Sequence, residues 1–102
     1  MNPRYGLREL DIERLCAVFR RHPEIRRVLL YGSRAKGNYK RGSDIDIAIV
    51  GNIDDRALNQ LATELDDLLL PYQLDIAVYE GIQNAELKSH IDRVGQPLFE
   101  RD

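Results

Sequence analysis

The stretch from Leu30 to Val50 constrains the fold most, because it joins a strand ending in Gly-Ser, a basic connection and a second strand with two aspartates. Asp44 and Asp46 alternate with isoleucines in this second strand. Since side chains alternate across a strand, both carboxylates lie on one face and the isoleucines lie on the other. We therefore expect one core face and one charged face.

Gly32 and Ser33 end the preceding strand at a point where a helix can begin. The free backbone N–H groups at the start of a helix favour an anion, and phosphate is a common one. The connection that follows carries the densest positive charge of the chain, at Arg34, Lys36, Lys40 and Arg41. We interpret Lys40 and Arg41 as loop charges. The sequence thus predicts a phosphate site beside the aspartates.

Three amphipathic segments have the apolar spacing of helices that cover a sheet. Their expected bounds are Leu7–His22, then Asp54 or Asp55 to Leu69, and Asn84–Val94. Leu10 and Leu69 belong to the apolar stripes of the first and second segments, and Gly95 is expected to serve as the C′ residue that ends the third. Short polar side chains at the second and third starts favour capping.

Three further apolar runs are typical of strands. Residues 25–31 end in the continuous apolar run Val28-Leu29-Leu30-Tyr31, which predicts burial on both faces, as in a central strand covered by helices. Residues 73–79 alternate and place a third carboxylate, Asp75, opposite Leu74 and Ile76. Residues 98–99 are expected to add a short edge strand. The elements together predict an α/β (α+β) fold, with a mixed β-sheet flanked by helices.

At 102 residues the chain is expected to form a single domain over residues 1–102, without room for a separate acceptor-binding domain. A net charge of −2 and 31% charged residues indicate no general attraction to nucleic acid or membrane. Cys16 is the only cysteine, which excludes an intrachain disulfide, and we interpret it as a small, partly buried hydrophobe. No apolar run is long enough for a membrane span, and no signal peptide is recognisable, so we expect a cytoplasmic protein.

The three aspartates are the candidate catalytic and metal-binding residues. Cα atoms two apart on a strand are roughly 6.6 Å from each other, so Asp44 and Asp46 can lean onto one divalent cation or a pair of them. Asp75 on a neighbouring strand can complete the cluster. Mg²⁺ prefers a few carboxylates together with water and substrate phosphate oxygens, which points to phosphoryl or nucleotidyl transfer. His22 and His90 are interpreted as a helix-end and a helix-surface residue.

The residues Gly32-Ser33-Arg34-Ala35-Lys36-Gly37 are followed by Asp44-Ile45-Asp46, with ten residues between Ser33 and Asp44, and this pattern resembles a known signature. It is the GS-x10-DxD motif of the polymerase-β-like nucleotidyltransferases, whose palm-like fold the chain is then expected to share. The chain is similar in particular to the minimal nucleotidyltransferases, which lack a separate substrate domain. The similarity spans nearly the whole chain, because the expected elements occur in the family's order.

The resemblance implies a role for each matching position. Gly32 and Ser33 hold the β- and γ-phosphates of the nucleotide, with Arg34 and Lys36 beside them. Asp44 and Asp46 ligate the metals. Asp75 ligates the catalytic metal near the attacking hydroxyl and helps to remove its proton. The implied cofactor is Mg²⁺, as two ions, and the implied substrate is ATP.

Minimal nucleotidyltransferases resemble the antitoxin halves of two-gene modules, whose partner is a helical HEPN-domain ribonuclease. The resemblance implies transfer of AMP from ATP to a hydroxyl of that partner, with tyrosine as the expected acceptor. One alternative is a catalytically silent, nucleotide-binding subunit that neutralises its partner by occlusion. Another is transfer to a small hydroxylated molecule, as in antibiotic nucleotidyltransferases, with a helical partner subunit supplying the acceptor site.

Overall fold

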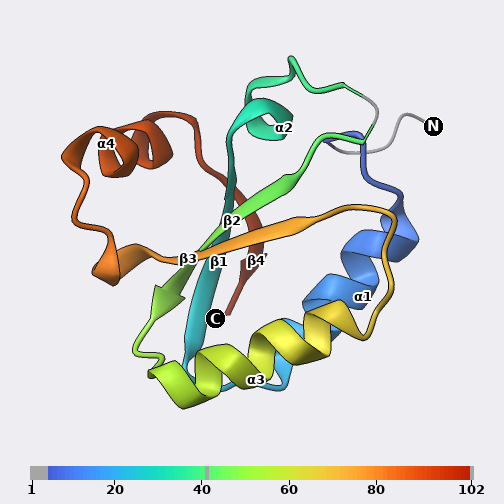
Figure 1. The fold of residues 1–102 in the computed structure, drawn as a ribbon, viewed down its shortest axis with the longest axis vertical. Helices are drawn as coiled ribbons and strands as arrows, with labels where there is room; N and C mark the ends of the chain where they lie inside the picture. Colours follow the sequence, from blue (N-terminus) through green and yellow to red (C-terminus); the bar gives the residue numbers. More distant parts are fainter. Residues whose placement is uncertain (1–4, 41, 102) are drawn as a thin grey trace.

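The structure, a computed structural model, describes residues 5–40 and 42–101 (Figure 1). Its helices are α1 (Glu9–Arg20), α2 (Ser33–Lys36), α3 (Asp55–Asp66), the 3₁₀ turn η1 (Tyr79–Gly81) and α4 (Ala85–Val94). Its strands are β1 (Ile25–Tyr31), β2 (Ile45–Gly51), β3 (Leu74–Val78) and β4 (Gln96–Glu100). In the part of the chain so described, no helix is long and apolar enough to cross a membrane.

The four strands form one mixed sheet in the order β3-β2-β1-β4. β1 pairs antiparallel with both β2 and β4, whereas β2 and β3 are parallel. The parallel pair is joined by the crossover that contains α3. This arrangement confirms the predicted mixed sheet flanked by helices, with β1 as a central strand.

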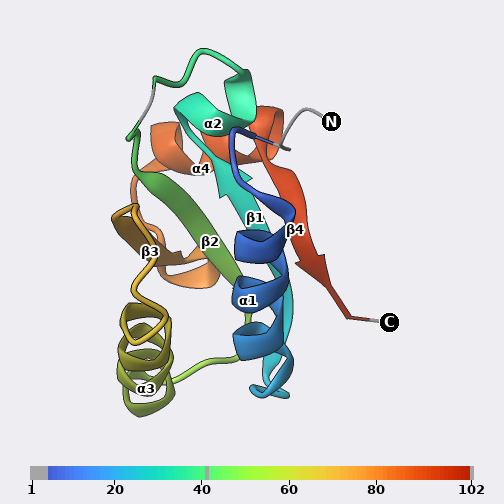
Figure 2. The ribbon, with the colours of Figure 1, turned by 90° about the vertical axis from the view of Figure 1, so that its right-hand side faces the viewer.

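Different helices cover the two faces of the sheet (Figure 2). On one face, α1 and α3 contribute Leu15, Phe19 and Leu61 to a core with Ile47 and Leu30 of the sheet. On the other face, α4 packs Ile91 against Tyr31 and Ala48. The second face is only partly covered, because α4 lies over one end of it and α2 caps the end of β1 (Figure 1). Asp46 therefore lies on a face of the sheet that the helices leave partly accessible.

Both predicted polar caps are present. The Asp54 carboxylate accepts a hydrogen bond of 2.8 Å from the Ala57 amide at the start of α3. The Asn84 side chain accepts from the amides of Glu86 and Leu87 at the start of α4. Gly95 follows the last residue of α4, as predicted, and its φ of −59° and ψ of 135° are not left-handed. The chain turns at once into β4 and needs no left-handed residue there.

Two leucines that were predicted to face the core are exposed, and these predictions are wrong. Leu10 lies near the start of α1 and is 59% exposed. α3 ends at Asp66 instead of reaching Leu69, which has a positive φ of 53° and is 87% exposed. The Arg14 guanidinium donates a hydrogen bond of 2.6 Å to the Leu68 carbonyl, so α1 binds the chain where it leaves α3. This contact favours a non-helical conformation after Asp66 over a continuation of α3 to Leu69.

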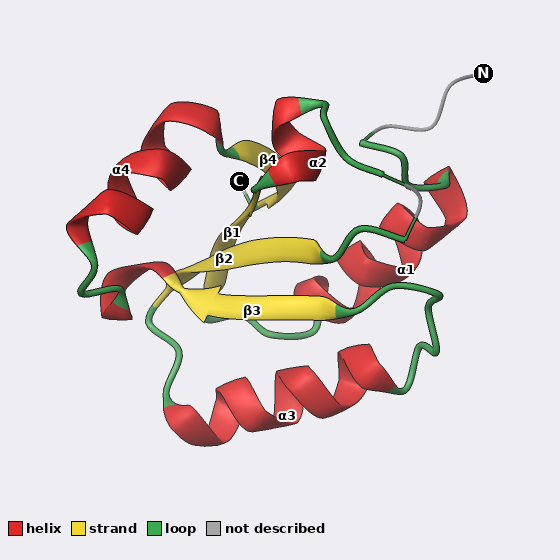
Figure 3. Cartoon of the chain, turned by 45° about the horizontal axis from the view of Figure 1, so that its top comes forward, coloured by secondary structure: helices red, strands yellow, loops and turns green. Residues whose placement is uncertain are grey.

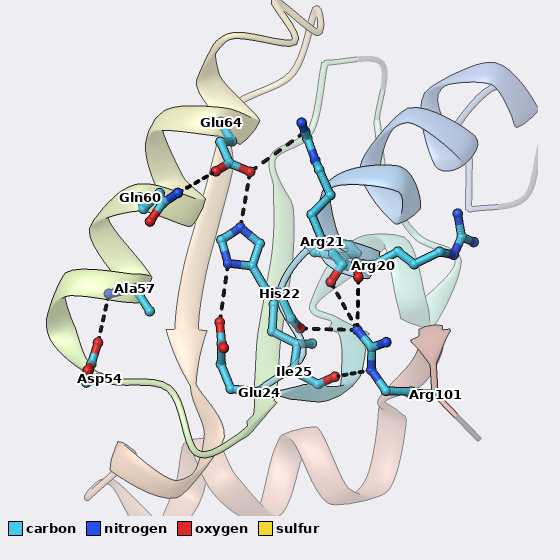
Figure 4. Close-up of polar contacts among 11 residues, drawn as sticks. Arg20, Arg21, His22, Glu24, Ile25, Asp54, Ala57, Gln60, Glu64 and Arg101 are labelled. Atoms are coloured by element: carbon cyan, nitrogen blue, oxygen red, sulfur yellow. Dashed lines mark hydrogen bonds and ion pairs between the residues drawn. The ribbon is translucent and has the colours of Figure 1, made fainter.

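His22 joins α1 to α3 in the close-up of Figure 4. It is 6% exposed and its Nδ1 and Nε2 atoms lie 3.3 Å from Glu24 and 3.1 Å from Glu64. Next to it, Arg101, which directly follows β4, donates hydrogen bonds to the carbonyl groups of His22 and of Ile25, the first residue of β1. Long-range polar contacts thus fasten the segment between α1 and β1 to both α3 and the residue that follows β4.

Glu64 is expected to make the free energy of unfolding depend on pH. Its hydrogen bond to His22 lowers its pKa, with smaller contributions from the charge of His22, from Gln60 and from Arg21. Because the folded pKa lies below the unfolded one, the stabilisation is complete above the unfolded pKa and is lost as pH falls through the folded pKa. In urea unfolding between about pH 6 and pH 3, Glu64→Gln should therefore show a shallower loss of stability than the wild type.

Asp66→Asn, on the same helix and exposed, is the matched control for Glu64→Gln. It should follow the wild-type pH dependence. Equal slopes for Glu64→Gln and the wild type would contradict the role assigned to the Glu64–His22 contact.

Candidate active site

Strand register brings Asp46 and Asp75 together on the face that α4 partly covers. Asp46 pairs with Tyr31 across the antiparallel β1–β2 ladder and with Asp75 across the parallel β2–β3 ladder. Neighbouring strands are about 4.8 Å apart, so the three side chains form one row across the sheet. β2 and β3 lie side by side beneath α2 and α4 in Figure 3. The row is located where the two strands begin.

Asp44 directly precedes β2 and is exposed. Burial raises the pKa of Asp46, and the charges of Asp75 and Asp44 raise it further, in that order. The three predicted aspartates therefore share one electrostatic environment. Like charges gathered in this way destabilise one another unless a cation or a proton compensates for them.

Gly32 approaches Asp46 more closely than any other residue type could. Its φ of 76° and ψ of −155° belong to a backbone region that is essentially limited to glycine. A Cβ atom at this position would collide with Oδ2 of Asp46. The turn that leads into Ser33 and α2 therefore lies directly against the carboxylate, as the predicted neighbouring phosphate and cation sites require.

Replacing Gly32 by Ala is expected to destabilise the fold by about 3 kcal/mol, because backbone strain and the collision with Asp46 add. Gly37→Ala is the matched control, since Gly37 also has a positive φ, of 90°, but no atom lies within 4 Å of a Cβ there. It should cost about 1 kcal/mol in urea unfolding. The additional change Asp46→Ala should recover part of the loss at Gly32. Equal costs for the two glycine variants would contradict this account.

Arg34 was predicted to lie beside the nucleotide phosphates, but in the structure its guanidinium is buried and bound to backbone carbonyl groups. It is 2% exposed, and its Nε and Nη2 atoms donate to the Ser43 carbonyl at 3.1 and 2.7 Å. Its Nη1 atom donates to the Tyr5 carbonyl at 2.9 Å. The guanidinium also lies 5.3 Å from the ring centroid of Tyr39 and 4.9 Å from that of Tyr72. Arg34 is thus engaged in holding the segment that precedes Asp44.

The other predicted contacts of the basic connection have different surroundings. Ser33 begins α2 and is partly exposed, and Lys36 ends this helix and is exposed. The Lys40 amide donates a hydrogen bond of 2.8 Å to the Ser43 hydroxyl, which links the two ends of a short turn before Asp44. Arg41 lies outside the described residues. Ser33 and Lys36 therefore remain the predicted phosphate contacts of this segment.

Two aromatic residues that the sequence analysis did not assign to the site also belong to it. Tyr31 is part of the row with Asp46 and Asp75, and burial followed by these two charges raises its pKa. The His90 ring packs edge-on against Tyr31, with centroids 6.1 Å apart. His90 was interpreted as a helix-surface residue. The available signal was its spacing, three residues after the inward-facing Leu87 and four before Val94.

The donor set fits a hard divalent cation, since it consists of carboxylate oxygens. Among residues 5–40 and 42–101, however, no three His, Cys, Asp or Glu side chains converge as a group able to hold a metal by themselves. Mg²⁺ is usually bound by one or two carboxylates, with phosphate oxygens and water as its other ligands. An arrangement that a substrate phosphate completes agrees with this preference.

Comparisons with known proteins agree with the geometry. Residues 13–102 match the family described as "Polymerase beta, Nucleotidyltransferase". The Methanocaldococcus jannaschii protein named "Putative protein adenylyltransferase MJ0604" is 46% identical over 41 residues, which are 40% of this chain and 41% of that protein. The match thus spans about two fifths of this curated relative.

Solved structures show the same fold. A toxin–antitoxin structure with AMP-PNP superposes with a TM-score of 0.71 and 24% identity, over 89% of this chain and 74% of that chain. A complex of the tri-AMPylated Shewanella oneidensis HEPN toxin with MNT antitoxin gives 0.67 and 22%, over 91% and 72%. The fold and the extent of the family match lead to one conclusion: the chain belongs to the polymerase beta nucleotidyltransferase family.

Proposed function

We propose that this protein is a Mg²⁺-dependent nucleotidyltransferase that moves AMP from ATP to a hydroxyl group of a partner protein. The observation that carries the proposal is the row of Asp46 and Asp75, with Asp44 and the Gly32 turn beside it. Carboxylates next to a phosphate-binding turn are what an in-line displacement at a nucleotide phosphate requires. Family membership supports the same reaction class.

The reaction divides among the residues by position. The Gly32–Ser33 turn and Lys36 hold the β- and γ-phosphates, while Asp44 and Asp46 hold Mg²⁺. The acceptor oxygen bonds to the α-phosphorus, the bond from that phosphorus to the bridging oxygen of the β-phosphate breaks, and pyrophosphate leaves. Asp75 lies at the acceptor side and receives the hydroxyl proton. Bound Mg²⁺ supplies the positive charge that neutralises the phosphates.

A helical HEPN-type protein is the proposed acceptor, and the protein then acts as its antitoxin in the cytoplasm. Both solved structures described above are toxin–antitoxin structures, and in one of them the HEPN toxin is tri-AMPylated. The described residues form one sheet with its covering helices and contain no separate acceptor-binding unit. We infer that the acceptor is a tyrosine hydroxyl of that partner, and that AMP is transferred to the partner once or several times.

Incubation of the purified protein and its HEPN partner with α-labelled ATP and Mg²⁺ tests the proposal. Label is expected on the partner, and mass spectrometry should locate added AMP on a tyrosine. Omission of Mg²⁺, or its removal by a chelator, should abolish the label. An unlabelled partner in the complete wild-type mixture, with both proteins folded, would overturn the proposed transfer.

A further inference from the structure

His90 extends from α4 toward the row of site residues on the sheet. It is partly exposed, and its ring contacts Tyr31 edge-on, at an interplanar angle of 81°. In the part of the chain that the structure describes, neither ring nitrogen makes a hydrogen bond to protein. The aromatic contact therefore orients the imidazole while its polar atoms stay available.

The electrostatic influence of His90 reaches the carboxylates. Its charge lowers the pKa of Asp46, against the raising effects of burial, Asp75 and Asp44. Across the sheet the order is Asp75 on β3, Asp46 on β2 and Tyr31 on β1. His90 contacts Tyr31, which is the neighbour of Asp46 on the side away from Asp75. Tyr31 is the last residue of β1 and leads into Gly32 and Ser33.

We infer that His90 binds the nucleotide, with an imidazole N–H donating a hydrogen bond to a phosphate oxygen of the bound nucleoside triphosphate. The inference rests on the proposed function, since it deepens the nucleotide site. Three observations carry it: the contact with Tyr31, the partly exposed ring without a protein hydrogen bond, and the position of Tyr31 directly before the Gly32-Ser33 turn, which is the proposed phosphate site. α2 and α4 both lie above β2 and β3 in Figure 3, so the triphosphate would be held between these two helices.

Histidine NMR signals test this directly, because the chain has only two histidines. His22 lies between Glu24 and Glu64 and serves as an internal control. In a titration of the wild type with AMP-PNP and Mg²⁺, the ring signals of His90 should shift together with the amides of Gly32 and Ser33. The ring signals of His22 should stay in place.

Substitutions separate binding from packing. His90→Phe keeps an aromatic ring against Tyr31 but removes the N–H donor, so the Kd for AMP-PNP should rise about tenfold. His90→Gln restores a donor and should recover part of this affinity. Ser89→Ala, at an exposed position of the same helix, should bind as the wild type does.

The two proposals fail in distinguishable ways. If the Gly32 and Ser33 amides shift while the His90 ring does not, and His90→Phe binds AMP-PNP with wild-type affinity, the inference is overturned and the nucleotide site stands. If saturating AMP-PNP shifts neither the amides nor the ring, both the inference and the proposed function are overturned.

Discussion

Asp46→Asn is expected to reduce transfer of AMP to the partner about 1000-fold, equivalent to ~4 kcal/mol of transition-state stabilisation. Asp46 lies at the centre of the row, with Asp75 beside it and the Gly32 turn against its Oδ2 atom. Asparagine keeps the shape of the side chain but removes the charge that attracts Mg²⁺. Initial rates of partner labelling measure the effect, and Asp66→Asn on the surface of α3 is the matched control.

The same substitution should not weaken the fold. The raised pKa of Asp46 means that its ionisation costs stability, so the wild type loses stability as pH rises from the unfolded pKa through the folded pKa. Asp46→Asn lacks this loss and should equal or exceed the stability of the wild type in urea at pH 7. In addition, Mg²⁺ with AMP-PNP should raise the melting temperature of the wild type more than that of the variant. Loss of activity together with unfolding would count against a catalytic explanation.

Asp46→Asn also distinguishes transfer from occlusion. If the protein neutralises a HEPN ribonuclease by transferring AMP, the variant should fail to block RNA cleavage after incubation with ATP. If it acts by covering the partner, the variant should inhibit as the wild type does. Cleavage of a labelled RNA by the partner, at equal concentrations of each variant, gives the answer.

Arg34→Ala is expected to lower the free energy of unfolding by about 4 kcal/mol. The substitution removes the donors to the carbonyls of Ser43 and Tyr5 and the cation–π contacts with Tyr39 and Tyr72. Without the guanidinium, two partly buried carbonyl groups lose their hydrogen bonds. Urea unfolding at pH 7 measures the loss.

Arg34→Lys should recover only a small part of the stability, because an ammonium group cannot donate two bonds to one carbonyl and a third to another in the same plane. Lys36→Ala, in the same short helix but exposed, should change stability by no more than about 0.5 kcal/mol. A loss for Lys36→Ala as large as that for Arg34→Ala would show that the connection responds to charge in general. In that case the specific contacts of Arg34 would not explain its effect.

Local patterns predicted the elements well because local forces decide them. The alternation of Asp44 to Val50 correctly placed isoleucines in the core, and Asp54 and Asn84 cap their helices as expected. Leu69 failed the same type of reasoning. Leu69 does have helical spacing, but α3 ends before it, where Arg14 binds the Leu68 carbonyl. Arg14 lies 54 residues from Leu68 in the sequence, so the local apolar periodicity cannot predict this contact.

The sequence by itself determined the Gly32-Ser33 turn, the two aspartates of one strand face and the family to which they belong, because each depends on neighbouring residues. Only the tertiary structure decided that Asp75 pairs with Asp46, since strand register joins residues far apart in the chain. It likewise assigned Arg34 to the loop before Asp44 and brought His90 to Tyr31. Basic and aromatic side chains are long enough to reach several alternative partners, and the packing of the whole chain decides which partner each one contacts.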